Sequence, residues 1–223
     1  MPNNISLTAD DGHQLGAYER QVEGSVGGIV VLQEIFGVNS HIRSVTDRFA
    51  DLGYSAIAPA LFDRQTVDFQ SGYSSEEIEA ARPLLNGFDW ETAVLDVKAA
   101  VDHLSSQGLK VSVVGFCLGG SLAYLSAIRM KNLTAAVCYY GGYITKIADE
   151  TPNCPTVLHY GEHDHTISME DVAHVTKMRA DIDIHTYDAG HGFNCDARGS
   201  YNKESADLAW TRSVDVIAKA MNG

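Results

Sequence analysis

One cysteine lies in a setting that could activate it as a nucleophile. The motif Gly115-Phe116-Cys117-Leu118-Gly119-Gly120 follows an apolar run that begins at Val111 and precedes a segment rich in small residues. A strand, a Gly-x-Cys-x-Gly turn and a helix in this order are typical of a nucleophile elbow, with a thiol in place of the usual hydroxyl. The sulfur would then lie at a helix N-terminus, where backbone N–H groups and the helix dipole favour a thiolate. We interpret Cys117 as the nucleophile; the alternative is a structural cysteine beside a glycine turn.

A carboxylate and an imidazole that could activate this thiol come later in the chain. Asp164 follows the apolar run that ends at Tyr160, and His191 follows the run that ends at Tyr187. Functional side chains gather where the strands of such sheets end, and the order nucleophile, acid, histidine is the one expected with this elbow. His191 would take the thiol proton, and Asp164 would hold the tautomer of the ring. A solvated loop histidine and a helix-capping aspartate are the ordinary alternatives.

A polar stretch around Asp164 also allows a metal site to be considered. It contains His159, Glu162, His163 and His165 as further candidate ligands. In an extended or turning segment these side chains would point in different directions, and no helical HExxH spacing is present. We therefore predict no metal and no other cofactor, and a metal-dependent hydrolase stays the less favoured alternative.

The segments that must position these residues alternate between short apolar runs and longer helical patterns. Such alternation predicts βαβ units and a parallel sheet, and hence an α/β fold with helices on both faces of a mostly parallel sheet. Ser74 with Glu77 predicts a capping box. The predicted strands are Gly28–Leu32, Tyr54–Ala58, Lys110–Gly115, Ala135–Tyr139, Thr156–Tyr160 and Asp183–Tyr187. The predicted helices are Ile42–Leu52, Ser74–Leu85, Trp90–Ser105, Gly120–Arg129, Met169–Ala180 and Ser205–Met221.

Composition narrows the class of protein further. The chain has 223 residues, 45% of them hydrophobic, which fits one globular domain over residues 1–223. A net charge of -13 argues against nucleic acid as a partner, because phosphate binding needs a basic face. We find neither a signal-peptide pattern nor an apolar run of membrane-spanning length. Four cysteines without a CxxC pair favour a reducing cytoplasm.

These motifs together resemble the dienelactone hydrolase (carboxymethylenebutenolidase) family along nearly the whole chain. The matching pieces are Gln33 to Asn39, the Cys117 elbow, Tyr139 to Gly142, the Asp164 loop and Gly190 to Phe193. The resemblance implies the α/β-hydrolase fold and a triad of Cys117, His191 and Asp164. It also implies that Glu34 holds the resting thiol protonated and accepts its proton when substrate binds. A surface charge at a strand end is the alternative for Glu34.

The resemblance and the fold that it implies also indicate how substrate would be bound. The backbone N–H groups of Leu118 and Ile35 would form the oxyanion hole. Tyr139 is expected to contact substrate. Family members that act on dienelactone bind its carboxylate with two arginines, and here Arg82 and Arg198 lie near those positions but not at them. They are either replacements at shifted positions or surface residues. The resemblance therefore supports the triad better than it supports dienelactone as the substrate.

We therefore expect a monomeric cytoplasmic enzyme that hydrolyses a small lactone or ester, with no membrane partner. Two alternatives stay open. One is a general carboxylesterase or thioesterase that uses the same residues on a different substrate. The other is a catalytically silent binding member of the fold, against which the complete set of cysteine, aspartate and histidine argues.

Overall fold

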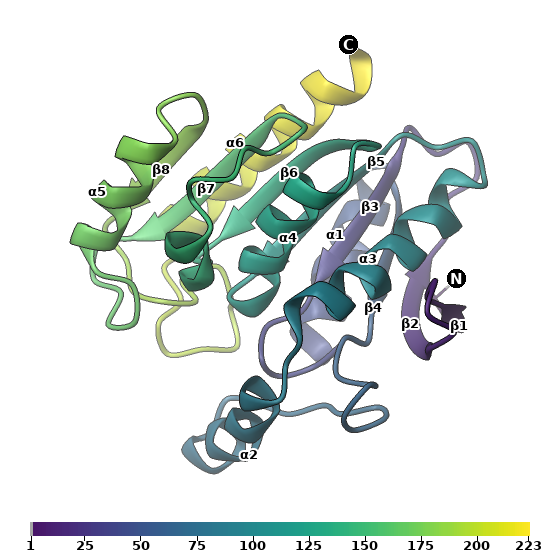
Figure 1. Ribbon diagram of the computed structural model, residues 1–223, viewed down its shortest axis with the longest axis horizontal. Coiled ribbons are helices and arrows are strands. Elements are labelled where there is room, and N and C mark those ends of the chain that lie inside the picture. The colour runs from purple at the N-terminus through teal and green to yellow at the C-terminus, as the bar shows by residue number, and fades with distance from the viewer. Residues whose placement is uncertain (1) are drawn as a thin grey trace. The chain divides into compact units, whose positions relative to one another are not determined.

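The computed structural model describes residues 2–223, which form eight strands and six α-helices. After the first three strands, helices and strands largely alternate along the chain (Figure 1). The chain forms two compact units that divide after Val113, inside strand β5. The strands are β1 Pro2–Thr8, β2 Gln14–Arg20, β3 Gly28–Leu32, β4 Ser55–Pro59, β5 Val111–Phe116, β6 Leu133–Tyr139, β7 Thr156–Gly161 and β8 Asp183–Tyr187. The helices are α1 Ser40–Asp51, α2 Ser75–Asn86, α3 Trp90–Ser105, α4 Leu118–Arg129, α5 Met169–Met178 and α6 Lys203–Asn222, with a 3-10 helix at Gly142–Lys146.

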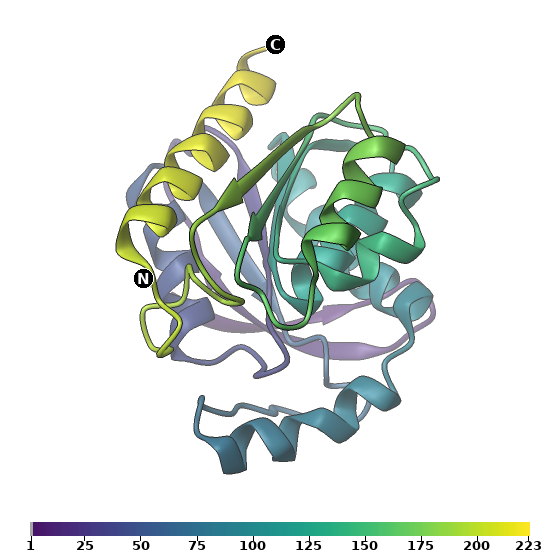
Figure 2. The same cartoon turned by 90° about the vertical axis from the view of Figure 1, so that its left-hand side faces the viewer.

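The first unit is built on strands in the order β1-β2-β4-β3. β3 and β4 pair in parallel with Val30 opposite Ile57, whereas β2 pairs antiparallel with both β1 and β4. Every residue of β3 and β4 is buried, as expected for strands that are covered on both faces. Helices α1 and α3 pack on these strands from opposite sides (Figure 2).

The second unit continues from β5 with the order β5-β6-β7-β8. β6 pairs in parallel with β7, and β7 in parallel with β8, so that the carboxyl ends of these strands point the same way. α4 and α5 lie on one face of these strands and α6 on the other (Figure 2). Cys117, Asp164 and His191 each lie in the segment that follows the carboxyl end of a strand of this unit.

The predicted fold class, strands and helices are confirmed. Some of these strands and helices begin or end at other residues than predicted, and the reasons are local. α1 begins two residues earlier than predicted because the side chain of Asn39 accepts a hydrogen bond from the Ile42 N–H and caps it. Asn202 likewise caps α6, which begins at Lys203. The predicted capping box is present, with Ser74 as the cap of α2 and Glu77 as its reciprocal partner.

The hairpin of β1 and β2 was not predicted from the sequence. Leu7 pairs with Leu15 and both are buried. Ser6 and Thr8, on either side of Leu7, are exposed. The turn between the strands includes Gly12 with a φ of 86°. An Asp-Gly pair between alternating segments is a hairpin signal, so this element was within reach of sequence reasoning. None of the described helices is both long and apolar enough to cross a membrane.

Candidate active site

Cys117 lies in a strained turn between β5 and α4. Its φ of 55° and ψ of −111° are unusual for a residue with a side chain, and such a conformation costs on the order of 1–3 kcal/mol. The turn is held on both sides, because the Cys117 N–H donates to the Tyr139 carbonyl at 3.0 Å and its carbonyl accepts from the Ser121 N–H at 3.2 Å. The thiol is partly exposed. The backbone is therefore strained in the conformation that presents this side chain, as in a nucleophile elbow.

Glycines make the turn possible. A Cβ on Gly115 would lie 1.9 Å from the carbonyl oxygen of Gly119, and one on Gly120 would lie 2.2 Å from that of Tyr139. Both distances are far below van der Waals contact, so neither position has room for a side chain. The N–H of Leu118 belongs to the first turn of α4, where N–H groups have no acceptor within the helix.

Asp164 is held as a carboxylate that faces His191. Its Oδ1 accepts from the backbone N–H of Thr166 at 2.7 Å, from the Thr166 hydroxyl at 2.7 Å and from the Ile167 N–H at 3.1 Å. Its Oδ2 lies 2.7 Å from Nδ1 of His191. Burial works to raise the pKa of Asp164, but the bonds from His191 and Thr166 outweigh it and the pKa is lowered. Thr166 was not predicted, although Asp-x-Thr spacing is typical of such a turn.

His191 connects this carboxylate to the cysteine. Its side chain is 17% exposed, its Nδ1 lies 2.7 Å from Oδ2 of Asp164, and Cys117 is close enough for its charge to act on the ring. Burial of the ring works to lower its pKa, but the negative charge at Cys117 and the Asp164 carboxylate raise the pKa of His191 to about 10. Asp164 and Cys117 thus both favour the protonated form of the ring, as is needed in a base that takes a proton from the thiol.

Tyr140, rather than Tyr139, lies beside this histidine. The Tyr139 ring is fully buried, stacks on Phe116 with centroids 4.7 Å apart, and its hydroxyl lies 2.8 Å from the Ser213 hydroxyl. It packs the core of the second unit, and we do not retain Tyr139 as a substrate-binding side chain. The next residue has a φ of 39°, and the Tyr140 ring centroid is 4.9 Å from that of His191. The strand ends between the two residues, and this change of backbone turns the second ring toward the site.

His159 is a core residue with a single assignable tautomer. The Ser213 hydroxyl donates to the Ala209 carbonyl at 2.7 Å, so its oxygen accepts from Nε2–H of His159 at 3.0 Å. Nδ1 then accepts from the Tyr187 hydroxyl at 2.8 Å. The ring is buried, and burial, reinforced by the positive charges of His185 and Arg212, holds the pKa of His159 well below its usual range.

Neighbours of His159 in the polar stretch have other partners. Nε2 of His163 lies 2.6 Å from Oδ1 of Asp188 on the surface, and Glu162 accepts from the Thr186 hydroxyl at 2.8 Å. These side chains therefore point in different directions, as predicted for an extended or turning segment.

The buried neutral state of His159 predicts a loss of stability in acid. Because the unfolded chain takes up a proton near pH 6.5 and the folded ring does not, the free energy of unfolding should fall by up to about 1.4 kcal/mol per pH unit below that value. Urea unfolding at successive pH values measures this slope. His159→Gln should reduce it, whereas the exposed His163→Gln should leave it unchanged. Equal slopes in the wild type and His159→Gln would contradict this account.

Glu34 lies in the first unit, just beyond the end of β3, and is fully buried. Burial excludes the alternative of a surface charge. The Tyr73 hydroxyl donates to its Oε2 at 3.2 Å, and a ring nitrogen of His41 lies within 4.8 Å of a carboxylate oxygen. Glu34 and His41 could each supply one ligand to a cation. Neither Tyr73 nor His41 was predicted, because both come from segments without a recognisable motif. Ile35, the proposed second oxyanion donor, is half-buried.

The two candidate arginines are in different settings. Arg82 is exposed on α2, where its Nε lies 2.8 Å from Oε1 of Glu79. Arg198 is half-buried in the second unit and crosses the backbone beside the site, since a Cβ on Gly192 would lie 2.5 Å from its Nη1. Gly192 follows His191 directly, so Arg198 is the arginine that this unit places close to the histidine. Both remain predictions as substrate ligands.

Comparison with known proteins places the chain in a family. Residues 15–221 match the dienelactone hydrolase family. The chain belongs to this family. A carboxymethylenebutenolidase of Pseudomonas putida is 33% identical over 229 residues, covering 98% of the chain and 97% of the relative. A Synechocystis protein provisionally named as a carboxymethylenebutenolidase is 37% identical over 203 residues, or 82% of each chain.

Solved structures agree with the family assignment. A crystal structure provisionally assigned as a dienelactone hydrolase from Klebsiella pneumoniae superposes with a TM-score of 0.87 at 29% identity, covering 98% of both chains. An esterase of Pyrococcus furiosus has a TM-score of 0.73 at 15% identity and covers 99% of this chain and 93% of that one, which supports the fold alone. The predicted α/β-hydrolase fold and the predicted family are thus confirmed. Membership in the dienelactone hydrolase family makes the chain a carboxylic ester hydrolase.

Proposed function

We propose that this protein hydrolyses a small lactone or ester through a Cys117, His191 and Asp164 triad. The observation that carries the proposal is the buried Asp164–His191 pair, 2.7 Å apart, with Cys117 close enough for its charge to act on the same ring. Three residues from separate loops are aligned in the order that nucleophilic catalysis requires. The strained elbow is a second support, because a structural cysteine needs no such conformation.

In the proposed reaction the Cys117 sulfur attacks the carbonyl carbon while His191 holds the proton. The carbon–oxygen bond of the ester breaks, and the leaving oxygen takes that proton from His191. Water then attacks the thioester with His191 as the base, which releases the acid and restores the thiol. For a lactone, the leaving oxygen stays attached to the acyl chain, so a single hydroxy acid is the product.

The negative oxygen of each tetrahedral intermediate needs donors that are already in place. We assign the Leu118 N–H as one of them because it opens the first turn of α4. By family resemblance, the Ile35 N–H is proposed as the second donor and Glu34 as the group that controls the resting thiol. The burial of Glu34 supports a functional carboxylate rather than a surface one.

We propose Arg198 rather than Arg82 as the group that binds a carboxylate on the substrate. The Arg198 guanidinium lies against Gly192, the residue next to His191, whereas Arg82 lies on an exposed helix face. An arginine can bind a carboxylate through two parallel hydrogen bonds, which fixes its orientation as well as its charge. This assignment makes dienelactone, or another small lactone with a carboxylate, the proposed substrate.

The kcat/KM on dienelactone, measured beside that on p-nitrophenyl acetate, tests the proposal. We expect a clear preference for dienelactone, and Arg198→Gln should raise its KM about 10-fold or more, since a hydrogen bond to a charged group contributes about 1.5–3 kcal/mol. The same variant should leave p-nitrophenyl acetate hydrolysis within about two-fold of the wild type because that ester has no carboxylate. Arg82→Gln is the matched control and should change neither substrate.

The outcomes of this measurement are distinct. Activity on the simple ester alone would discard dienelactone as the substrate and leave a general carboxylesterase. Loss of activity on both esters, together with no acylation of Cys117, would mean a binding protein and would overturn the proposal.

We also propose a monomeric enzyme of the cytoplasm that needs no cofactor. All four cysteines are free thiols, which a reducing compartment would preserve. The net charge of -13 favours separate molecules in solution.

A further inference from the structure

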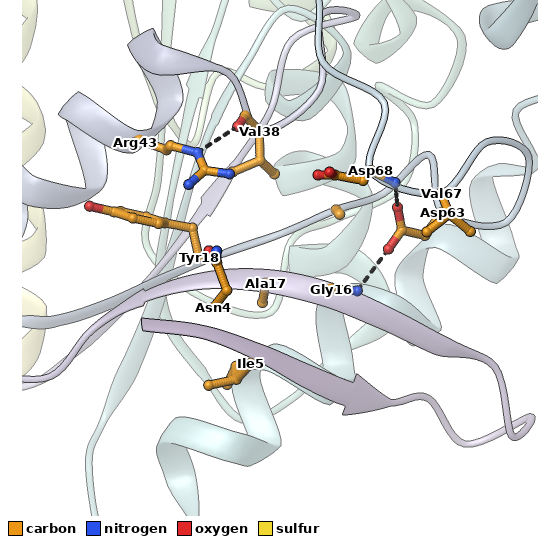
Figure 3. A pocket seen from close by; sticks show the side chains of 11 residues that line it. Asn4, Ile5, Gly16, Ala17, Tyr18, Val38, Arg43, Asp63, Val67 and Asp68 are labelled. Atoms are coloured by element: carbon orange, nitrogen blue, oxygen red, sulfur yellow. Dashed lines mark hydrogen bonds between the residues drawn. The ribbon is translucent and has the colours of Figure 1, made fainter. Parts of the chain in front are cut away.

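A cavity of about 310 Å³ lies within the first unit, and its lining contains none of the residues assigned above (Figure 3). It is formed by β1, β2, the start of α1 and the loop after β4. Its apolar wall consists of Ile5, Ala17, Val38, Ala60 and Val67. A cavity at the lower end of the size range of ligand pockets accommodates a small organic molecule.

Arg43 stands at one end of this cavity with its guanidinium fixed in orientation. Its Nε–H donates to the Val38 carbonyl at 3.0 Å, and its Cζ lies 4.9 Å from the centroid of the Tyr18 ring. That ring is held in turn, since the Tyr18 hydroxyl donates to Asp47 at 2.8 Å. Figure 3 shows the guanidinium above Tyr18, on the side of the cavity opposite Asp63 and Asp68.

The two terminal amino groups of Arg43 have no partner within residues 2–223. The nearby carboxylate of Asp47 is engaged by Arg20 at 2.8 Å as well as by Tyr18. The protein has 29 acidic residues and 16 basic ones, so an arginine without an ion pair stands out. A guanidinium whose fork is open toward a partly apolar cavity has the geometry that binds a carboxylate.

The opposite wall is acidic. The carboxylate of Asp63 accepts from the Gly16 N–H at 2.7 Å and from the Asp68 N–H at 2.8 Å, so both of its oxygens serve the protein (Figure 3). Asp68 adds a second negative charge, held in place by a bond from Gln70 at 2.8 Å. A ligand that carries one carboxylate would be attracted by Arg43, whereas a second carboxylate at its far end would be repelled.

We propose that this cavity is a binding site for a small monocarboxylate with a compact apolar body. The carboxylate pairs with the terminal amino groups of Arg43, and the body packs against the apolar wall. Asp63 and Asp68 exclude dicarboxylates of similar length. The proposal rests on the first unit alone and does not depend on the proposed catalytic reaction.

Methyl NMR of the full chain, with Cys117 first alkylated by iodoacetamide, tests this site. The probes are 3-methylbutanoate, the neutral amide of the same shape, and methylbutanedioate. We expect saturable shifts of the Val38, Val67 and Ile5 methyl groups with 3-methylbutanoate, and affinities at least 10-fold weaker for the amide and the dicarboxylate. Comparison of the acid and the amide needs no variant, so the test stands even if a variant folds poorly.

Two variants make the assignment specific. Arg43→Gln should weaken 3-methylbutanoate binding at least 10-fold, and Asp68→Asn should reduce the discrimination against methylbutanedioate. Equal affinity for the acid and the amide, or binding unchanged in Arg43→Gln, would overturn the proposal. Shifts confined to Ile167, beside Asp164, would place the acid at the proposed active site and would overturn it too.

Discussion

Replacement of Cys117 by alanine should reduce kcat/KM on any substrate of this enzyme by about 10⁴-fold or more, because loss of the nucleophile leaves only binding and the oxyanion donors. The fold should persist, since alanine fits where the thiol was and the strained backbone is held by Tyr139 and Ser121 on either side. Steady-state kinetics and thermal unfolding measured together separate these two effects.

The other thiols provide the control for this experiment. Cys154→Ala removes a free, partly exposed cysteine from the same unit and should leave kcat/KM within about two-fold of the wild type. Intact-protein mass spectrometry after brief exposure to an activated ester should show an acyl adduct on the wild type and none on Cys117→Ala. Undiminished hydrolysis by Cys117→Ala would exclude the proposed mechanism.

The conservative change Asp164→Asn should lower kcat by about 10³- to 10⁴-fold. The oxygen of the new side-chain amide can keep the bonds from Thr166 and Ile167, which turns its NH₂ group toward His191. The ring must then accept at Nδ1 and carry its proton on Nε2, so it can no longer take the proton of Cys117. The pKa of His191, raised to about 10 in the wild type, should also fall because the Asp164 charge is lost.

A second aspartate and histidine pair in the same unit serves as the matched control. Asp188 lies 2.6 Å from His163, but both side chains are exposed, so Asp188→Asn should change kcat little. NMR titration of the histidine rings, run beside the kinetics, reports the pKa of His191 directly. If Asp188→Asn were as damaging as Asp164→Asn, or if the His191 pKa were the same in Asp164→Asn and the wild type, the proposed role of Asp164 would be wrong.

Local sequence was sufficient to predict most of the fold and the centre of the site. The alternation of apolar runs and helical patterns predicted β3 to β8 and the six α-helices, but not β1 and β2, because periodicity and capping depend on near neighbours in the chain. The Cys117 elbow was equally visible, since its geometry is imposed by glycines two and three residues away. Asp164 and His191 could be predicted because parallel strands present their following loops at one edge.

Tertiary structure alone decided which of several similar side chains take part. Nothing local to the chain distinguishes Tyr139 from Tyr140, yet one packs against α6 and the other against His191. His159 and His163 are four residues apart, but one is buried and neutral while the other is a surface residue. The cavity at Arg43 combines segments from Asn4 to Asp68. These cases have the same physical reason. The direction, the burial and the charge partners of a side chain depend on which distant strands and loops pack together, and this packing cannot be predicted from local periodicity.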